Sequence, residues 1–180
     1  MPIEGQPSTH LVIHTDPGCD DALAIFAAVS AASERFSEID FVAIYGNDAT
    51  RQTGKNLLTL GVIIDELRQT DSVLPERAYF SGSEHALHKK RAYKGNADFI
   101  MGRNVLEGIQ RTSDRLLEPS GVIYDKFSSK PDATIHVVSL GALTELVTMI
   151  SREDVARRIR SVTVMGGTLF EEGNYSMHVE

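Results

Sequence analysis

The 180-residue sequence has a single cysteine, no tryptophan and no long apolar stretch. One cysteine, Cys19, excludes an intrachain disulfide framework and a cysteine-rich zinc site, and it fits a reducing compartment. The longest uninterrupted apolar run, residues 22–29, is far shorter than the roughly 20 residues that span a bilayer. The N-terminal residues also lack the charged start and apolar core of a secretory signal. We therefore expect a cytoplasmic protein with no membrane partner.

Positive charge is scarce as well. Lysine and arginine number 18 against 25 aspartates and glutamates, which gives a net charge of −7. A negative net charge opposes electrostatic binding to nucleic acid or to an anionic membrane. Hydrophobic residues make up 42% of the chain, enough to bury a sizeable core. Composition therefore predicts one globular domain over residues 1–180 that binds neither partner.

The hydrophobic pattern alternates between strand-like and helix-like segments. Short apolar, β-branched runs predict strands at residues 11–15, 41–45, 78–80, 134–139 and 161–165. Longer apolar segments predict helices at residues 22–29, 50–69, 97–109 and 142–150. The first of these helices is predicted to be buried. The polar segment 119–131 is too weakly periodic to assign. Alternating strands and helices predict an α/β fold, an open and mostly parallel sheet with helices on both faces.

Ligands of such sheets bind beyond the carboxyl ends of the strands, and three aspartates follow the first strand. Asp16, Asp20 and Asp21 repel one another, and no lysine or arginine lies within twelve residues on either side. A bound cation would relieve the repulsion, and all-oxygen ligands favour Ca²⁺ or Mg²⁺. Alternatively, Asp20 caps the following helix and Asp21 favours its dipole, which leaves Asp16 unexplained.

Other chemistries fit this turn poorly. A dinucleotide site requires G-x-G-x-x-G, and only Gly18 is present. The pair Gly54-Lys55 lacks the remaining residues of a P-loop, and no G-x-S-x-G elbow occurs. Cys19 stands among carboxylates that would raise the pKa of its thiol, so we interpret it as a spacer rather than a nucleophile.

Residues 14–22, His-Thr-Asp-Pro-Gly-Cys-Asp-Asp-Ala, resemble the D-T-D-P-G-x-D-D-A signature of the inosine–uridine-preferring nucleoside hydrolases. Further blocks follow in the family's order: Gly46-Asn47, residues 141–144 where the family has G-P-L-T-N, residues 165–167 and Gly173-Asn174. The resemblance implies a Rossmann-like α/β core. It also implies an enzyme, a homodimer or homotetramer, that hydrolyses the N-glycosidic bond of ribonucleosides to ribose and free base.

The same resemblance implies roles for individual residues. Asp16, Asp20, Asp21 and the backbone carbonyl of Leu140 would hold Ca²⁺, and Asp16 would also be the general base on the metal-bound water. The positions that would contact the ribose are Asn47, Met165, Asn174 and Glu180.

The chain also departs from the family pattern. His14 stands where the family has an aspartate that supports the site, and Glu145 replaces the asparagine of T-N. Residues 93–102, which include Lys94, replace the family's H-G-x-D-G-L-G segment. In the family the glutamate at position 180 is followed by F-N and, much later, by a histidine–aspartate pair, so we expect a C-terminally truncated domain.

These departures leave the nucleobase preference open and keep two alternatives in view. One is a related hydrolase of pyrimidine or other ribosyl compounds. The other is a degenerate or fragmentary family member that binds a ribosyl ligand or a partner without turnover.

Overall fold

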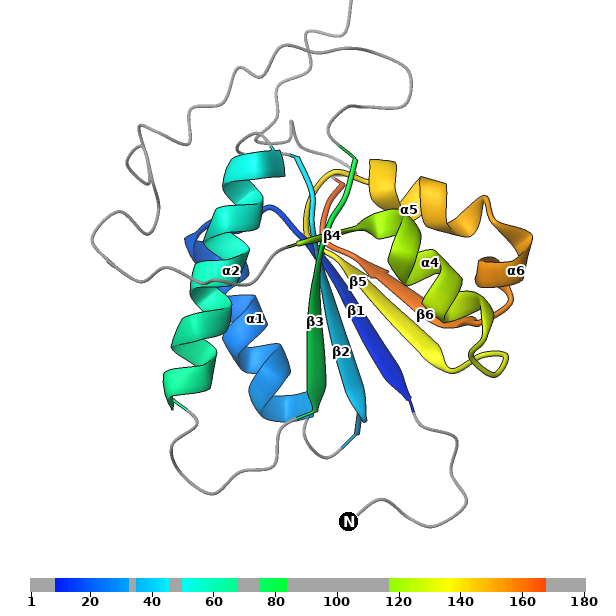
Figure 1. The fold of residues 1–180 in the computed structure, drawn as a ribbon, viewed down its shortest axis with the longest axis horizontal. Helices are drawn as coiled ribbons and strands as arrows, with labels where there is room; N and C mark the ends of the chain where they lie inside the picture. The colour runs from blue at the N-terminus through cyan, green and yellow to red at the C-terminus, as the bar shows by residue number, and fades with distance from the viewer. Residues whose placement is uncertain (1–8, 33–34, 46–49, 68–74, 84–116, 168–180) are drawn as a thin grey trace, which may run out of the picture.

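A computed structural model describes residues 9–32, 35–45, 50–67, 75–83 and 117–167. Within these residues, six parallel strands form one sheet in the order β4-β3-β2-β1-β5-β6 (Figure 1). The strands are β1 (His10–Thr15), β2 (Glu38–Ala43), β3 (Glu76–Ser81), β4 (Glu118–Pro119), β5 (Ile135–Ser139) and β6 (Ile159–Val164). The mostly parallel α/β sheet expected from the alternating pattern is confirmed.

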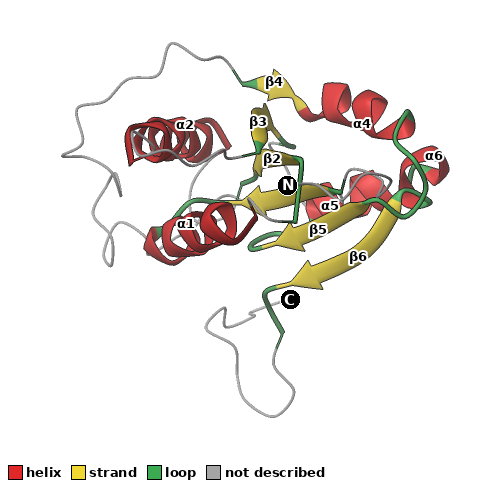
Figure 2. Cartoon of the chain, turned by 90° about the horizontal axis from the view of Figure 1, so that it is seen from below, coloured by secondary structure: helices red, strands yellow, loops and turns green. Residues whose placement is uncertain are grey.

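Helices cover both faces of the sheet. One face carries α1 (Cys19–Ala32) and α2 (Thr50–Leu67), and the opposite face carries α4 (Ser120–Ser128), α5 (Thr144–Ile150) and α6 (Glu153–Ala156) (Figure 2). Parallel neighbours need a crossover connection, and these helices lie in the connections β1–β2, β2–β3, β4–β5 and β5–β6. The arrangement is therefore the doubly covered open sheet that places ligands at the carboxyl ends of its strands.

Alternation along the central strand β1 assigns its side chains to two separate cores. Leu11 and Ile13 pack in the cluster under α1 and α2, whereas Val12 packs in the cluster under α4 and α5. His10 and His14 share the face of Val12 because strand side chains alternate with a period of two. The same rule puts Thr15 on the α1 side, where its side chain contacts Asp21.

The structure corrects three details of the predicted elements. The segment 119–131 begins with the last residue of the short β4 and contains the helix α4, whose Ile123, Tyr124 and Phe127 are buried. The helix after β1 is longer than predicted and is buried on one side only, since Leu23 is 71% exposed. The second strand ends at Ala43, two residues earlier than predicted. The predicted helix at 97–109 lies outside the described residues.

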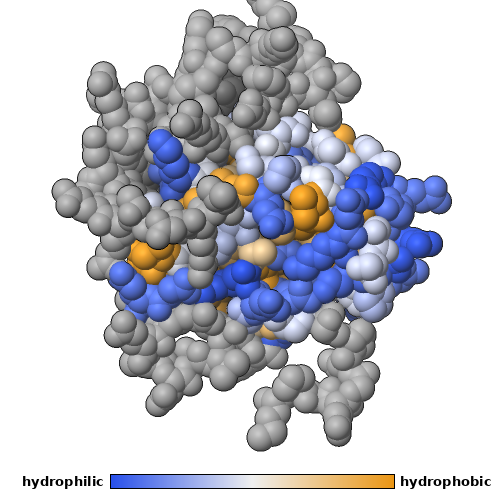
Figure 3. Space-filling model, viewed as in Figure 1, coloured by the Kyte–Doolittle hydropathy of each residue, from blue (hydrophilic) through white to orange (hydrophobic). Residues whose placement is uncertain are grey.

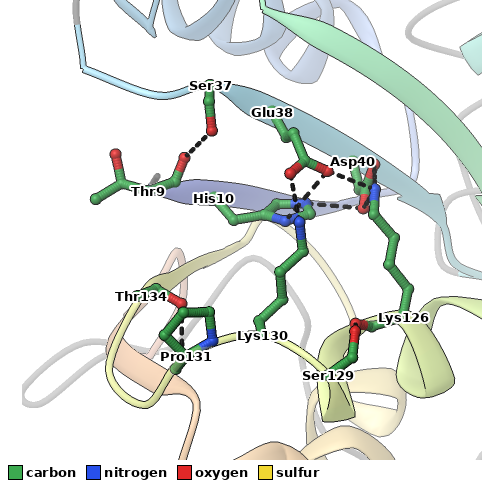
Figure 4. Close-up of polar contacts among 10 residues, drawn as sticks. All are labelled: Thr9, His10, Ser37, Glu38, Asp40, Lys126, Ser129, Lys130, Pro131 and Thr134. Atoms are coloured by element: carbon green, nitrogen blue, oxygen red, sulfur yellow. Dashed lines mark hydrogen bonds and ion pairs between the residues drawn. The ribbon is translucent and has the colours of Figure 1, made fainter. Parts of the chain in front are cut away.

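A charged network joins the amino ends of β1 and β2 to α4 and the turn after it (Figure 4). His10 Nε2 lies 2.8 Å from Asp40 Oδ2, and both side chains are buried. The Lys126 ammonium lies 3.0 Å from Asp40 Oδ2 and 2.9 Å from Glu38 Oε2, and Lys130 forms a further ion pair with Glu38. The two lysines balance the two carboxylates, so these four side chains neutralise one another.

The described residues that are visible in Figure 3 are mainly hydrophilic, and the apolar ones among them show only as separate patches. The outer strand β6 is the exception within the sheet, because Val162 and Val164 are each 43% exposed. No helix in the described ranges has the length and apolar content needed to cross a membrane.

Candidate active site

Asp16 follows the last residue of β1 and is buried at the carboxyl edge of the sheet. Its carboxylate packs against Gly141, which follows β5. A Cβ added at Gly141 would overlap Asp16 Oδ1 and would come within 3.0 Å of both Asp16 Cγ and Ile44 Cδ1. The ends of β1, β2 and β5 therefore meet at Asp16, and Gly141 leaves room for its carboxylate.

Asp21 lies in the first turn of α1 and is also buried. Its Oδ1 accepts a hydrogen bond of 2.6 Å from the Thr15 hydroxyl, and backbone N–H groups of Gly18 and Asp16 also donate to the carboxylate. Burial raises the pKa of the Asp21 carboxyl, the hydrogen bonds oppose this, and the charge of Asp20 adds to the rise. Asp21 therefore fixes the turn 16–20, and a nearby cation would stabilise its charged form.

The turn is held from the other side by α2. Asn56 is buried and donates from Nδ2 to the Pro17 carbonyl at 3.4 Å. One turn earlier, the Thr53 hydroxyl donates to the Ile44 carbonyl at 2.8 Å. Side chains from one helix thus fix the backbone beyond both β1 and β2.

The three aspartates occupy different environments. Asp16 and Asp21 are buried, whereas Asp20 is exposed. Among the described residues no three His, Cys, Asp or Glu side chains converge as a set of metal ligands. The donor chemistry nevertheless fits a hard cation, because every candidate atom is oxygen. Further oxygen ligands would be needed to reach the six to eight that Ca²⁺ takes.

The remaining predicted residues divide into described and undescribed positions. Leu140 directly follows β5, and its N–H donates to the His14 carbonyl at 2.9 Å. Met165 directly follows β6, is exposed, and donates from its N–H to the Ser139 carbonyl at 2.8 Å. Both therefore lie at the same sheet edge as Asp16. Asn47, Asn174 and Glu180 lie outside the described residues.

A buried polar layer on the α4 and α5 side was not predicted as part of the site. Glu145, in the first turn of α5, accepts hydrogen bonds from the Tyr124 hydroxyl and, at 2.7 Å, from the Ser83 N–H. Its charge also acts on His14, which is buried two residues before Asp16. The departures from the family pattern at positions 14 and 145 were the only signal in the sequence that pointed to these two residues. They identify both residues as unusual but do not show that the two interact.

Comparisons with known proteins agree with this geometry. The family model described as inosine-uridine preferring nucleoside hydrolase matches residues 11–180. The chain is 27% identical over 174 residues to uridine nucleosidase 1 of Arabidopsis thaliana, covering 94% of this chain and 48% of that protein. It is 28% identical over 178 residues to the non-specific ribonucleoside hydrolase RihC of Salmonella agona (strain SL483), covering 96% of this chain and 53% of that protein.

A solved structure extends the similarity to three dimensions. The purine-preferring ribonucleoside hydrolase from Gardnerella vaginalis superposes with a TM-score of 0.72 at 25% identity, covering 93% of this chain and 51% of that chain. The chain thus spans about half the length of the relatives that it matches.

Proposed function

Because the chain belongs to the inosine-uridine preferring nucleoside hydrolase family, we propose that its protein hydrolyses the N-glycosidic bond of ribonucleosides to ribose and free base. The observation that carries the proposal is the placement of Asp16. Its carboxylate is buried at the carboxyl edge of a parallel sheet, and Gly141 is the residue that leaves it room. Ligands of open α/β sheets bind at this edge.

Asp16 is proposed as the general base. Cleavage of an N-glycosidic bond passes through an oxocarbenium-like transition state with positive charge on the ribose. A carboxylate beside the sugar would accept the proton of the attacking water and favour that positive charge. General-base help is worth about 10²- to 10⁴-fold, so positioning of the ribose has to supply the rest of the acceleration.

Asp16, Asp20, Asp21 and the Leu140 carbonyl are proposed to hold Ca²⁺, together with oxygen ligands from outside the described residues. When bound, the ion would lower the pKa of a water molecule and orient the sugar hydroxyls. The hydrogen bonds from Thr15 and from the backbone of the turn keep Asp21 pointed at the same turn that carries Asp16.

Met165, Asn47, Asn174 and Glu180 are proposed to contact the ribose. Met165 is the one of these four that is described, and its exposed position beyond β6 suits a contact with substrate rather than with the core. A cytoplasmic homodimer or homotetramer is proposed for the whole protein, on the strength of the family and of the single cysteine.

Ribose release tests the function directly. Purified protein is incubated with inosine, uridine or nicotinamide riboside, with Ca²⁺ or with a chelator, and free ribose is measured by a reducing-sugar assay. We expect release that depends on Ca²⁺ and differs among the three substrates. Release that persists unchanged after chelation would contradict the metal assignment.

A family member without turnover is the second candidate, favoured by the departures at His14 and Glu145. It predicts ribosyl-ligand binding, measured by calorimetry, with no ribose released from any of the three substrates. The same incubations therefore separate the two candidates.

A further inference from the structure

Large apolar side chains gather on the outside of α5 and β6, and we call this surface the α5–β6 face. Its members, each between 40% and 45% exposed, are Leu143, Val147, Ile150, Val162 and Val164. They make up five of the eight large hydrophobic side chains that are exposed in the described part of the chain. Single exposed hydrophobic residues are common, but a group of them in one place indicates a surface that another element covers.

The two strand residues of the face lie on the side of the sheet that carries α5. Val162 is paired with Val137 of β5, and Val137 belongs to the core cluster under α4 and α5. Val164 is two residues further along β6, so it points to the same side. The surface that β6 presents beside α5 is therefore apolar.

The three helix residues of the face lie on the flank of α5 that is turned toward β6. Leu143, Val147 and Ile150 are spaced by four and three residues, so they form one stripe. The stripe is about 150° around the helix axis from Glu145, whose carboxylate accepts a hydrogen bond from the Tyr124 hydroxyl of α4. Because α4 contacts β3 and β4, at the opposite end of the sheet from β6, the stripe points away from α4 and borders β6.

No charged side chain interrupts this face or the strand edge next to it. Between residues 141 and 151 the one ionisable side chain is that of Glu145, which is buried, and residues 161–167 contain none. Among the described residues β6 is the last strand of the sheet and pairs with β5 alone. Exposed edge strands usually carry charged residues or proline that prevent pairing with another chain. The composition of residues 161–167 is instead typical of a strand inside a sheet.

The path of the chain determines where a further element would lie. From β1 to β3 the chain moves toward one edge of the sheet with α1 and α2 on one face, and from β5 to β6 it moves toward the other edge with α5 and α6 on the opposite face (Figure 2). Crossovers between parallel strands are almost always right-handed. A further crossover outward from β6 would therefore place its helix on the face of α5, where the exposed valines of β6 lie.

The relatives have the length for such an element, because the chain spans only about half of each protein that it matches. We propose that the part of the protein that follows residue 180 covers the α5–β6 face. It adds a parallel strand to the open edge of β6 and packs the apolar side of a helix against the stripe of α5 and the valines of β6. This proposal does not depend on the proposed activity.

Cysteine labelling of the whole protein tests whether the face is covered. Val147→Cys and Val162→Cys are made in a Cys19→Ser background, since Cys19 is exposed, and their reaction with a maleimide is timed under native conditions. Val122→Cys is the matched control, because Val122 is 47% exposed on α4 and lies outside the face. We expect both face cysteines to react at least about 10-fold more slowly than the control. Equal rates at the three positions would overturn the proposal.

Dilution identifies what covers the face. Protection by the same polypeptide does not change with protein concentration, whereas protection by a second copy does. We expect the labelling rates of Val147→Cys and Val162→Cys to be independent of concentration. Protection that disappears on dilution would assign the face to a second copy and overturn the proposal. A protein that ended with residue 180 and still protected both cysteines would overturn it as well.

Hydrogen exchange tests the added strand. In an edge strand about every second amide is bonded to a neighbour, whereas pairing on both sides bonds all of them. We expect slow exchange at every amide of residues 160–164 in the whole protein, as in β2, which pairs on both sides. Fast exchange at alternate amides of β6 would overturn the added strand.

A charge placed on the face tests the same contact through stability. In the whole protein we expect Val162→Lys to lower the melting temperature by at least about 5 °C, because the ammonium would be buried, and Val122→Lys to change it by under about 1 °C. Lysine at a buried position can prevent folding, and in that case the milder cysteine variants decide the question. An unchanged melting temperature in Val162→Lys would overturn the proposal.

Discussion

The two ends of the sheet both bury acids, but they satisfy them differently. At the amino ends, Glu38 and Asp40 contact the ammonium groups of Lys126 and Lys130. At the carboxyl ends, Asp21 and Glu145 accept hydrogen bonds from the Thr15 and Tyr124 hydroxyls and from backbone N–H groups. Ammonium groups neutralise a carboxylate, whereas hydroxyl and amide donors orient it and leave its charge in place.

This difference favours the carboxyl end as the place of the proposed chemistry. A network that balances its own charge gains little from a further ion, so the amino end holds the fold together. Carboxylates that keep their charge in a buried place attract a positive group, such as a divalent ion or a ribose with oxocarbenium character. Changes at the carboxyl edge should therefore affect turnover more than stability, and changes at the amino edge the reverse.

Asp16→Asn should produce the largest effect. The amide keeps the size of the side chain but cannot accept a proton, so we expect ribose release to fall by about 10²- to 10⁴-fold. Circular dichroism should show an unchanged fold. Asp132→Asn is the control, because Asp132 is an exposed acid that pairs with arginines far from the site edge. A rate within 3-fold of the wild type in Asp16→Asn would remove Asp16 from the mechanism.

Asp40→Ala should have the largest effect at the amino end. It breaks a buried ion pair and removes the buried one of the two acids that His10 and Lys126 approach, which we expect to lower the free energy of unfolding by about 3 kcal/mol. Urea denaturation measures the change. Asp125→Ala is the control, since Asp125 is 79% exposed in its ion pair with Arg152 and should cost under about 1 kcal/mol. Equal losses of unfolding free energy in the two variants would show that burial of the charged network adds nothing to stability.

Gly141→Ala changes the geometry of the carboxyl edge and leaves every charge of the protein unchanged. The added methyl would displace the Asp16 carboxylate, so we expect a loss in kcat of up to about 10²-fold with a small change in melting temperature. Gly121→Ala is the matched control, because no atom lies within 4 Å of its Cβ position and α4 should gain about 0.5 kcal/mol. Full activity in Gly141→Ala would mean that the position of Asp16 is not critical.

Acid should weaken the amino end through Glu38. Burial alone would raise the pKa of its carboxyl, but hydrogen bonds from Lys130 and Lys126 and the charge of His10 bring it down to about 2. Because the pKa is lower in the folded than in the unfolded state, the stabilisation is complete above about pH 4.5 and is lost as the pH falls toward 2. After allowance for solvent screening we expect about 1 kcal/mol.

The free energy of unfolding of Glu38→Gln should therefore be lower than that of the wild type at pH 6, and the two should converge as the pH falls to about 2. Urea denaturation across this range provides the measurement. A gap between the two proteins that stays constant with pH would contradict the ion-pair explanation.

Sequence periodicity was sufficient for most of the sheet, because its central strands are short, apolar and bounded by turn residues. The helix α4 was missed because its buried Ile123, Tyr124 and Phe127 stand among polar residues and follow Pro119, which hides the helical period. Side-chain alternation also left the strand ends uncertain by two or three residues, as at β2. Hydrogen bonding between strands, which is not a local property, decides where each strand ends.

The placement of Asp16 at a sheet edge followed from the sequence, since carboxyl ends of parallel strands meet there. The environment of the acids did not follow from it. The contacts of Glu145 with Ser83 and Tyr124 join residues that are far apart in the chain. One sequence can mark such residues as unusual, but it contains no information on which distant backbone they contact.

The strand order has a consequence for synthesis of the chain on the ribosome. The central strand β1 pairs with β2 early, but its other neighbour is β5, where Ile135 lies opposite His10. A nascent chain that ends after β3 can cover one face of the sheet with α1 and α2. Val12 and Val42 on the other face stay uncovered until α4 and α5 have been synthesised. We expect the emerging half-sheet to expose an apolar face and an open strand edge, the features that chaperones shield and that favour aggregation.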